Sequence, residues 1–368
     1  MLNRQTRRQL LKGSVLGGVA ALRIEVQAQP SQGPGETPRQ SLWRMISGYH
    51  LSQLVHVAAK LRIADQLAGG SRTVAQLAAA TNTHADSLYR VLRTLAGMGI
   101  FYEEEDYRFR LTPAAEMLCS GVPGSLRAHA EAAGEEWLWR PWGALLHSVT
   151  TGETAFDHLY GKNTFDWFGE HPDAAHLAAS MYTENTAATS ESIVAVYDFS
   201  AARTVVDVGG GEGFLLMSIL RRNRNAHGVL FDLDPVVASA KSKLDRDIIW
   251  RCEFVGGDFF KAVPAGGDLY VMKHILHDWD DSRANKILNN CRRAMAGRGK
   301  LLVVDNMVCG RNQPCAAKES DINMMVRTGG RNRTEKEYRD LFAKSGFERV
   351  SSITSLGELS LIEVLPRS

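Results

Sequence analysis

The sequence of 368 residues predicts an α/β protein, in which a mainly helical winged-helix region precedes a Rossmann-like sheet that closes with an antiparallel hairpin. Three observations support this class. Helical patterns early in the chain are followed by two short β-rich runs, a buried strand later enters a glycine-rich turn, and the last two strand-like runs are joined by a very short connection. A hydrophobic content of 44% suits two domains with substantial cores.

The charge and the cysteines exclude several classes of protein. The net charge is +2, and residues 1–37 hold a surplus of positive charge, so the rest of the chain is close to neutral, which argues against nucleic acid as the main partner. The chain has no apolar run of about 18 residues, and no membrane-spanning helix is expected. The five cysteines form no CxxC pair and no cluster with histidine, so we expect free thiols and neither a disulfide framework nor a metal site.

Residues 1–37 are set apart from the fold as a leader. Arg7 and Arg8 are followed by a short, weakly apolar run and by small residues around Ala28. This order resembles a bacterial twin-arginine export signal. The alternative is a solvated tail, and residues 29–38, rich in Pro, Gly, Ser and Gln, are expected to be disordered in either case.

Residues 38–118 follow a winged-helix plan. Apolar side chains at helical spacing continue through residue 67, and Thr73 and Asp86 are placed to cap two further helices. Two β-rich runs come next, over 100–102 and 107–111, and the four carboxylates of 103–106 separate them. Carboxylates at a wing tip repel a phosphate backbone, so this region is expected to serve dimerisation or packing rather than DNA binding.

Residues 119–200 form a helical connector that is unusually aromatic. Any one of its large rings could belong to the core, but as a group they favour a pocket for a flat apolar ligand. The rings are Trp137, Trp139, Trp142, Phe156, Tyr160, Phe165, Trp167 and Phe168.

Residues 201–368 carry the pattern of a cofactor-binding sheet. The buried run 204–208 enters a glycine turn that begins at Gly209, and an expected second strand ends at Asp232, where a carboxylate can accept both hydroxyls of a ribose. A third expected strand, over 248–255, leads to Asp258 and Phe259, which could hold an adenine. The C-terminal runs 347–353 and 359–365 can pair only as an antiparallel hairpin, because their connection is so short.

The acids of the glycine turn narrow the choice of ligand. Nicotinamide, flavin and S-adenosylmethionine sites all use such turns, but Asp207 and Glu212 would repel a pyrophosphate. They favour a ligand with an ammonium and a sulfonium group, and S-adenosylmethionine is that ligand. The antiparallel end of the sheet also departs from the plan of dinucleotide dehydrogenases.

A candidate base follows the fourth expected strand, 268–272. His277 lies beyond the carboxyl end of this strand, and Asp305 ends the fifth strand, which is expected to be its neighbour. A phenol with a pKa near 10 is almost wholly protonated at neutral pH, and an imidazole with a pKa near 6.5 can accept its proton. A carboxylate on the far nitrogen would fix the tautomer of that imidazole. His274 is interpreted as a structural residue.

Taken together, these motifs are similar to the caffeate and acetylserotonin type of S-adenosylmethionine-dependent O-methyltransferase, a group that includes bacterial polyketide and carotenoid O-methyltransferases. The motifs are 207–213, 231–233, 257–259, 273–279 and 330–335, and the resemblance covers roughly residues 40–366. It implies a homodimer held by the winged-helix region, a small hydroxylated acceptor, and His277 as general base supported by Asp305. It also implies cofactor contacts from Gly209, Asp232, Asp258, Phe259 and Lys273, and an acceptor pocket lined by Met181, Met324 and Met325.

The chain departs from the plant members at three positions. Asp305 stands where they carry a glutamate, Asn332 where they carry a second glutamate, and Asn185 where a serine is usual. Some members of the group hydroxylate or decarboxylate their substrates, and that chemistry is the alternative function. The methyl donor is made in the cytoplasm, which favours a cytoplasmic enzyme, with export through Arg7 and Arg8 as the alternative.

Overall fold

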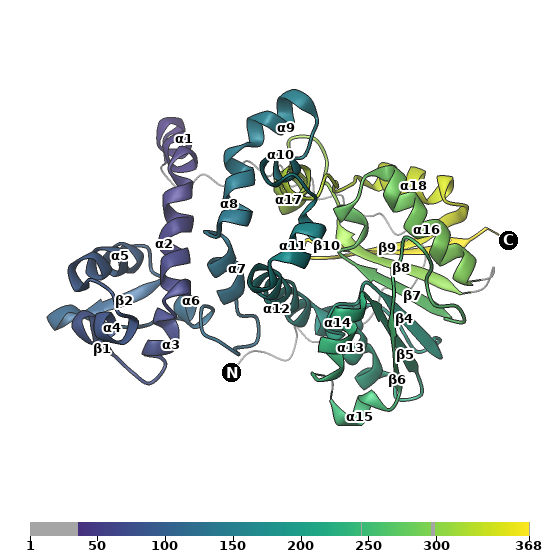
Figure 1. Ribbon diagram of the computed structural model, residues 1–368, viewed down its shortest axis with the longest axis horizontal. Coiled ribbons are helices and arrows are strands. Elements are labelled where there is room, and N and C mark those ends of the chain that lie inside the picture. The colour runs from purple at the N-terminus through teal and green to yellow at the C-terminus, as the bar shows by residue number, and fades with distance from the viewer. Residues whose placement is uncertain (1–35, 244, 296–298, 368) are drawn as a thin grey trace, which may run out of the picture.

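The computed structural model describes residues 36–243, 245–295 and 299–367 (Figure 1). Nearly all of the expected leader, including Arg7 and Arg8, lies outside these residues. The first described helix begins directly after the leader, because Thr37 accepts a hydrogen bond from the backbone N–H of Gln40 while the side chain of Gln40 accepts one from the backbone of Thr37. None of the helices in these ranges is both long and apolar enough to cross a membrane.

The first part of the structure is the expected winged helix. Its three-stranded sheet has the order β1-β3-β2, and the helices pack around buried side chains that include Leu92 and Phe109. Figure 1 shows α2 between the small sheet with α4 and α5 on one side and the helices of the next segment on the other. The elements are α1 (Pro38–Ile46), α2 (Gly48–Lys60), α3 (Ile63–Leu67), β1 (Arg72–Thr73), α4 (Val74–Thr81), α5 (Ala85–Gly97), β2 (Phe101–Glu104), η1 (Glu105–Tyr107), β3 (Arg108–Leu111) and α6 (Pro113–Glu116).

Three local expectations for this region were wrong. The helix does not continue from α2 into α3, because Arg62 adopts a left-handed conformation with φ of 52°. The cap of α5 is His84, whose ring nitrogen accepts from the N–H of Ser87, and Asp86 lies within the first turn. The wing tip is also shorter than expected, since Glu104 is part of β2 and forms an ion pair with Arg110 of β3.

A set of six helices connects the winged helix to the large sheet. α12 is the longest, and the connection between the two parts of the chain runs through contacts of α7 with both α2 and α12. These helices are α7 (Arg127–Ala132), α8 (Glu136–Gly143), α9 (Leu145–Thr151), α10 (Ala155–Tyr160), α11 (Thr164–Glu170) and α12 (Pro172–Val196).

The large sheet has seven strands in the order β6-β5-β4-β7-β8-β10-β9. β4 to β8 are parallel, and β10 is antiparallel to both of its neighbours, so the expected closing hairpin is confirmed. The strands are β4 (Thr204–Val208), β5 (His227–Asp232), β6 (Cys252–Gly256), β7 (Leu269–Lys273), β8 (Lys300–Asn306), β9 (Phe347–Leu356) and β10 (Leu359–Pro366).

Helices cover both faces of this sheet. Apolar side chains of α16 and α18 pack on one face, and those of α12, α13, α14 and α15 pack on the other. The expected third strand begins later than predicted, because residues 246–249 form α15 instead of extended chain. The remaining helices are α13 (Phe214–Arg222), α14 (Asp234–Lys241), α15 (Arg246–Ile249), η2 (Leu276–Asp278), α16 (Asp281–Met295), α17 (Ala316–Arg327) and α18 (Glu335–Lys344).

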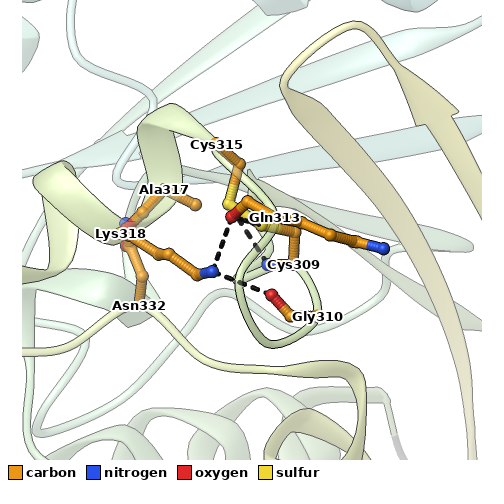
Figure 2. Close-up of a disulfide and its surroundings, with 7 residues drawn as sticks. All are labelled: Cys309, Gly310, Gln313, Cys315, Ala317, Lys318 and Asn332. Carbon is orange, nitrogen blue, oxygen red and sulfur yellow. Dashed lines mark hydrogen bonds between the residues drawn. A yellow bond between two sulfur atoms is a disulfide. The ribbon is translucent and has the colours of Figure 1, made fainter. Parts of the chain in front are cut away.

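The loop from β8 to α17 contains a disulfide between Cys309 and Cys315 (Figure 2). The expectation that all five cysteines are free thiols was therefore wrong for this pair, because cysteine spacing alone does not reveal which side chains the fold brings together. Lys318 ties the same loop to α17, since its ammonium donates to the carbonyls of Gly310 at 2.8 Å and Gln313 at 2.6 Å.

Candidate active site

A cavity of about 1930 Å³ lies at the carboxyl ends of the parallel strands. The chain passes from β4 outward to β5 and β6 and then returns to β7 on the other side of β4. Such a reversal opens a crevice where open α/β sheets bind their ligands. A pocket for one small molecule is typically about 300–1,000 Å³, so this cavity has room for two ligands side by side.

The glycine turn after β4 forms one wall of the cavity. Gly209 and Gly211 adopt positive φ of 71° and 57°, which L side chains rarely do. A Cβ on Gly209 would also collide with Ile275, and one on Gly210 would collide with Asp207. The turn therefore needs glycine both for its conformation and for close packing, and it brings the backbone to the cavity surface.

Two carboxylates, the buried Asp207 and the partly buried Asp232, face this turn. Asp232 accepts hydrogen bonds from the N–H groups of Gly211 at 2.8 Å and Leu233 at 2.7 Å, which fix its orientation. Burial and the charge of Asp232 raise the pKa of Asp207 to about 7, and its Oδ2 is buried with no hydrogen-bond partner. An unpartnered carboxylate oxygen beside a second carboxylate suits a positively charged ligand with sugar hydroxyls.

Glu212 does not contribute free negative charge, contrary to the sequence analysis. Its carboxylate forms an ion pair with Lys243 and accepts a hydrogen bond from Thr183 at 3.2 Å. The acidic character of this wall therefore comes from Asp207 and Asp232. The strand pattern of the sequence predicts that both lie at this end of the sheet.

Asp258, Phe259 and Lys273 all line the same cavity. Asp258 accepts a hydrogen bond from the N–H of Phe260 at 2.8 Å, which holds its carboxylate at the end of β6. Burial lowers the pKa of Lys273 to about 8 although the charges of nearby aspartates oppose this shift. Its ammonium donates to Asn185 at 3.0 Å and to Thr186 at 3.2 Å.

His277 and Asp305 meet at the base of the cavity. Nδ1 of His277 lies 2.8 Å from Oδ1 of Asp305, and its Nε2 lies 3.7 Å from Oδ1 of Asp278. Burial by itself lowers the pKa of an imidazole, but the two carboxylates outweigh it and raise the pKa of His277 to about 9. Burial likewise favours neutral Asp305, but the charge of His277 holds its pKa well below the usual range. The expected proximity of these two residues is confirmed.

His274 also lines the cavity, and its interpretation as a structural residue stays a prediction. Its ring stacks beside that of His277 with centroids 5.0 Å apart, and its Nδ1 lies 3.4 Å from the same oxygen of Asp305. The donor atoms of these three residues lie within 4.8 Å of one another, the one group of that kind in the described ranges with a spacing suited to a metal ion. The charges of His277 and Asp305 already compensate each other, and the absence of a metal site stays a prediction.

A segment after α17 holds the turn that carries His277, and its role was missed from the sequence. Arg333 is fully buried and donates to the carbonyls of Leu276 at 2.8 Å and Trp279 at 2.9 Å. The N–H of Arg331 donates to the carbonyl of His277 at 2.8 Å. The sequence carried no signal for this role, because the burial of Arg333 is set by tertiary contacts and a buried arginine is tolerated only where acceptors converge on it.

Aromatic and thioether side chains from the connecting helices and α17 line the cavity, together with polar ones such as those of Asn323 and Arg327. Met181 of α12 and Met324 of α17 line it, whereas Met325 does not, because successive residues of a helix point about 100° apart. The aromatic residues of the connector divide into two sets. Trp139, Trp142, Phe165 and Phe168 line the cavity, whereas Trp137, Phe156, Tyr160 and Trp167 pack in a cluster behind them that Phe168 also joins.

The three departures from the plant pattern have distinct consequences. Asp305 reaches His277 in spite of its shorter side chain. Asn185 accepts the hydrogen bond from Lys273. Asn332 donates to the carbonyl of Ala317 at 3.0 Å and so ties its segment to the start of α17, while its own Oδ1 is buried without a partner.

Comparison with known proteins agrees with this geometry. Residues 43–121 match the O-methyltransferase dimerisation domain and residues 142–348 match the O-methyltransferase domain. The chain is 42% identical to a phenazine O-methyltransferase of Lysobacter antibioticus over 90% of its own length and 98% of that relative.

Solved structures give the same result. The crystal structure of LaPhzM superposes with a TM-score of 0.86 at 42% identity, covering 90% of this chain and all of that one. NcsB1, an O-methyltransferase from neocarzinostatin biosynthesis, was solved with S-adenosylmethionine and 2-hydroxy-5-methyl naphthoic acid, and it superposes with a TM-score of 0.75 at 32% identity over 86% of this chain and 96% of its own.

The residues at the glycine turn fit S-adenosylmethionine, since they offer close backbone, an oriented carboxylate suited to sugar hydroxyls and an unpartnered acid suited to a cation. The similarity spans both parts of the chain and extends to methyl transfer rather than hydroxylation or decarboxylation. The chain therefore belongs to the family of S-adenosylmethionine-dependent O-methyltransferases.

Proposed function

We propose that the enzyme methylates a hydroxyl group on a small, flat aromatic acceptor, with His277 as the general base. The observation that carries this proposal is the His277–Asp305 pair, which faces a cavity with an acidic wall on one side and aromatic walls on the other. Relatives that act on a phenazine and bind a naphthoic acid support a flat ring as the acceptor. A screen of phenolic acceptors by mass spectrometry, with methyl-labelled donor, tests the reaction directly.

The donor is proposed to lie along the glycine turn, held by Gly209, Asp232, Asp258, Phe259 and Lys273. Asp232 would accept the ribose hydroxyls, because its carboxylate is already oriented by backbone N–H groups. Phe259 offers a ring face at the end of β6, and its carbonyl is anchored by Asn290. When bound, S-adenosylmethionine supplies a methyl group on a positively charged sulfur.

The proposed chemistry assigns one task to each polar group at the base of the cavity. His277 accepts the acceptor's hydroxyl proton at Nε2 as the oxygen becomes nucleophilic. Asp305 faces Nδ1, so it fixes the ring and stabilises the imidazolium that results. The apolar side chains that line the cavity hold the acceptor ring in line with the donor and keep water from the reacting oxygen. They include Met181, Met324 and Phe165.

The enzyme is proposed to act as a homodimer in the cytoplasm. An exposed apolar face on α1 supports the dimer, since Trp43 is 64% exposed and Leu42, Met45 and Ile46 are similarly open. The supply of S-adenosylmethionine, which is made in the cytoplasm, supports a cytoplasmic location. The Cys309–Cys315 disulfide points instead toward an oxidising compartment, as does the twin-arginine pattern. N-terminal sequencing of the protein from its own cells distinguishes retention from export.

Replacing Asp232 by alanine should weaken S-adenosylmethionine binding by more than about tenfold, because a ribose then loses its charged acceptor. Isothermal calorimetry measures this directly. Asp247→Ala is the matched control, since Asp247 is exposed on α15 outside the cavity. Equal affinities for the two variants would remove Asp232 from the donor site.

Replacing His277 by alanine should lower kcat at least about 100-fold, the usual contribution of a general base, while donor affinity stays within a few-fold. Single-turnover assays and calorimetry measure the two quantities separately. His227→Ala, at the exposed start of β5, serves as control. Near-normal turnover in the His277 variant would contradict the base assignment.

The pKa of His277 should be lower in the complex with S-adenosylmethionine than in the complex with S-adenosylhomocysteine. The two ligands differ in the positive charge on sulfur, and a nearby cation disfavours the imidazolium. In the free protein the pKa is about 9, so the base is mostly protonated at neutral pH and activity should rise as pH increases toward that value. NMR titration of the imidazole measures all three states, and identical values in both complexes would place the sulfur far from His277.

Replacing Trp43 by aspartate should shift the protein from dimer to monomer, because the change puts a charge in the middle of the exposed apolar face. Light scattering after size-exclusion chromatography gives the mass. Leu146→Asp, which alters an equally exposed apolar residue on α9, should leave the mass of the assembly unchanged. A Trp43 variant that keeps the wild-type mass would exclude this face as the interface.

A further inference from the structure

His274 presents one edge of its ring to Asp305 and the other to the cavity. Its Nδ1 lies 3.4 Å from Oδ1 of Asp305, which is the one side-chain hydrogen bond that His274 forms within the described parts of the chain. The side chain is 22% exposed and lines the cavity. Because the two nitrogens lie on opposite sides of an imidazole, a ring whose Nδ1 faces the cavity base directs Nε2 toward the space where a ligand would lie.

The backbone at His274 is held in an unfavourable conformation. Its φ of 56° is in the left-handed region, which residues other than glycine adopt uncommonly, although asparagine, aspartate and histidine do so more often than most. The N–H of His274 nonetheless donates to the carbonyl of Val304 at 2.9 Å, so the adjacent strand fixes this conformation. Strained residues of this kind cluster at ligand sites, because the strain persists only where the surroundings impose it.

The two neighbouring imidazoles differ in charge. Burial and the cation of Lys273 lower the pKa of His274 to about 4, whereas the pKa of His277 is raised to about 9. Neutral His274 therefore carries its single ring hydrogen on Nδ1, where it donates to Asp305. Its Nε2 is left with a lone pair and can only accept a hydrogen bond.

We propose that His274 determines acceptor specificity by accepting a hydrogen bond from a second donor, a hydroxyl or an amine, on the ring carbon next to the reacting hydroxyl. The rings of His274 and His277 are nearly parallel, with planes 22° apart, and both direct Nδ1 to the same oxygen of Asp305. Both residues line the cavity, so the proposal places both Nε2 atoms at the same ligand. This inference rests on the proposed function, since it takes the reacting hydroxyl to lie at Nε2 of His277.

A matched pair of acceptors tests the inference. 2,3-Dihydroxynaphthalene carries the second donor and 2-naphthol lacks it. His274→Asn keeps a residue that tolerates the left-handed backbone, but asparagine is too short to reach the position of Nε2. We expect this variant to lower the ratio of kcat/KM for the diol over kcat/KM for the naphthol about tenfold. Most of the change should appear as a higher KM for the diol. Because asparagine also removes the ring from its stack on His277, His274→Phe is measured in parallel, and S-adenosylhomocysteine binding verifies that each variant is folded.

Two outcomes would overturn the inference. If His274 only orients Asp305, its variants will lower kcat equally for both acceptors and shift the pH profile, and the ratio of kcat/KM for the diol over the naphthol will stay unchanged. The inference also fails if the wild-type enzyme shows no preference between the diol and the naphthol. Assays contain a chelator, so that an ion bridging His274 and Asp305 does not stand in for the hydrogen bond.

Binding experiments separate this inference from the proposed function. Calorimetry with S-adenosylhomocysteine present measures the affinity of each naphthalene for the wild type and both variants without turnover. Tighter binding of the diol to the wild type, lost in the variants, supports the role of His274 even where no methylated product forms, and in that case the proposed function fails alone. Methylation with equal diol affinity in all three proteins refutes the inference alone, and failure of the wild type to bind either ring refutes both.

Discussion

Asp305 is buried and ionised, and a buried carboxylate is tolerated only where positive charge and hydrogen bonds replace the water it has lost. His277 supplies that charge, and removing either partner would leave the other uncompensated. Much of the local structure secures this pairing. The parallel neighbours β7 and β8 bring the two residues to one edge of the sheet, and Arg333 fixes the carbonyls on either side of His277. The backbone around this ion pair is therefore held both by the parallel strands and by Arg333.

The cavity joins two chemically different halves. Asp207 and Asp232 make the wall next to the glycine turn acidic, whereas α8, α11, α12 and α17 contribute rings and thioethers to the cavity. The sheet supplies the first half and the connecting helices supply most of the second. A donor with a positive sulfur and an acceptor with a flat ring would therefore sort to opposite walls, with the imidazoles between them. This division explains why an aromatic helical segment precedes a cofactor-binding sheet in the same chain.

The parts of the fold that follow from local pattern could be predicted from the sequence. The parallel strands, the glycine turn and the closing hairpin have apolar runs and turn residues that specify them, and β-sheet order then predicts that Asp305 lies beside His277. Features set by tertiary contact could not be predicted in this way. His274 takes a left-handed conformation imposed by its neighbours, Glu212 is neutralised by a lysine 31 residues away, and half of the connector's rings face the core rather than the cavity. Each depends on which side chains meet in space, and sequence spacing does not encode that.

The disulfide lies on the chain segment that leads from Asp305 to α17 (Figure 2). Cys309 follows the strand that contains Asp305, and Cys315 precedes the helix that carries Met324. Closing this loop removes conformational freedom from the connection between Asp305 and the cavity-lining helix α17. Whether this disulfide has formed can therefore affect the measured activity. Protein made in a reducing cytosol and protein oxidised after purification differ in this bond, so samples compared for acceptor preference have to be matched in thiol content.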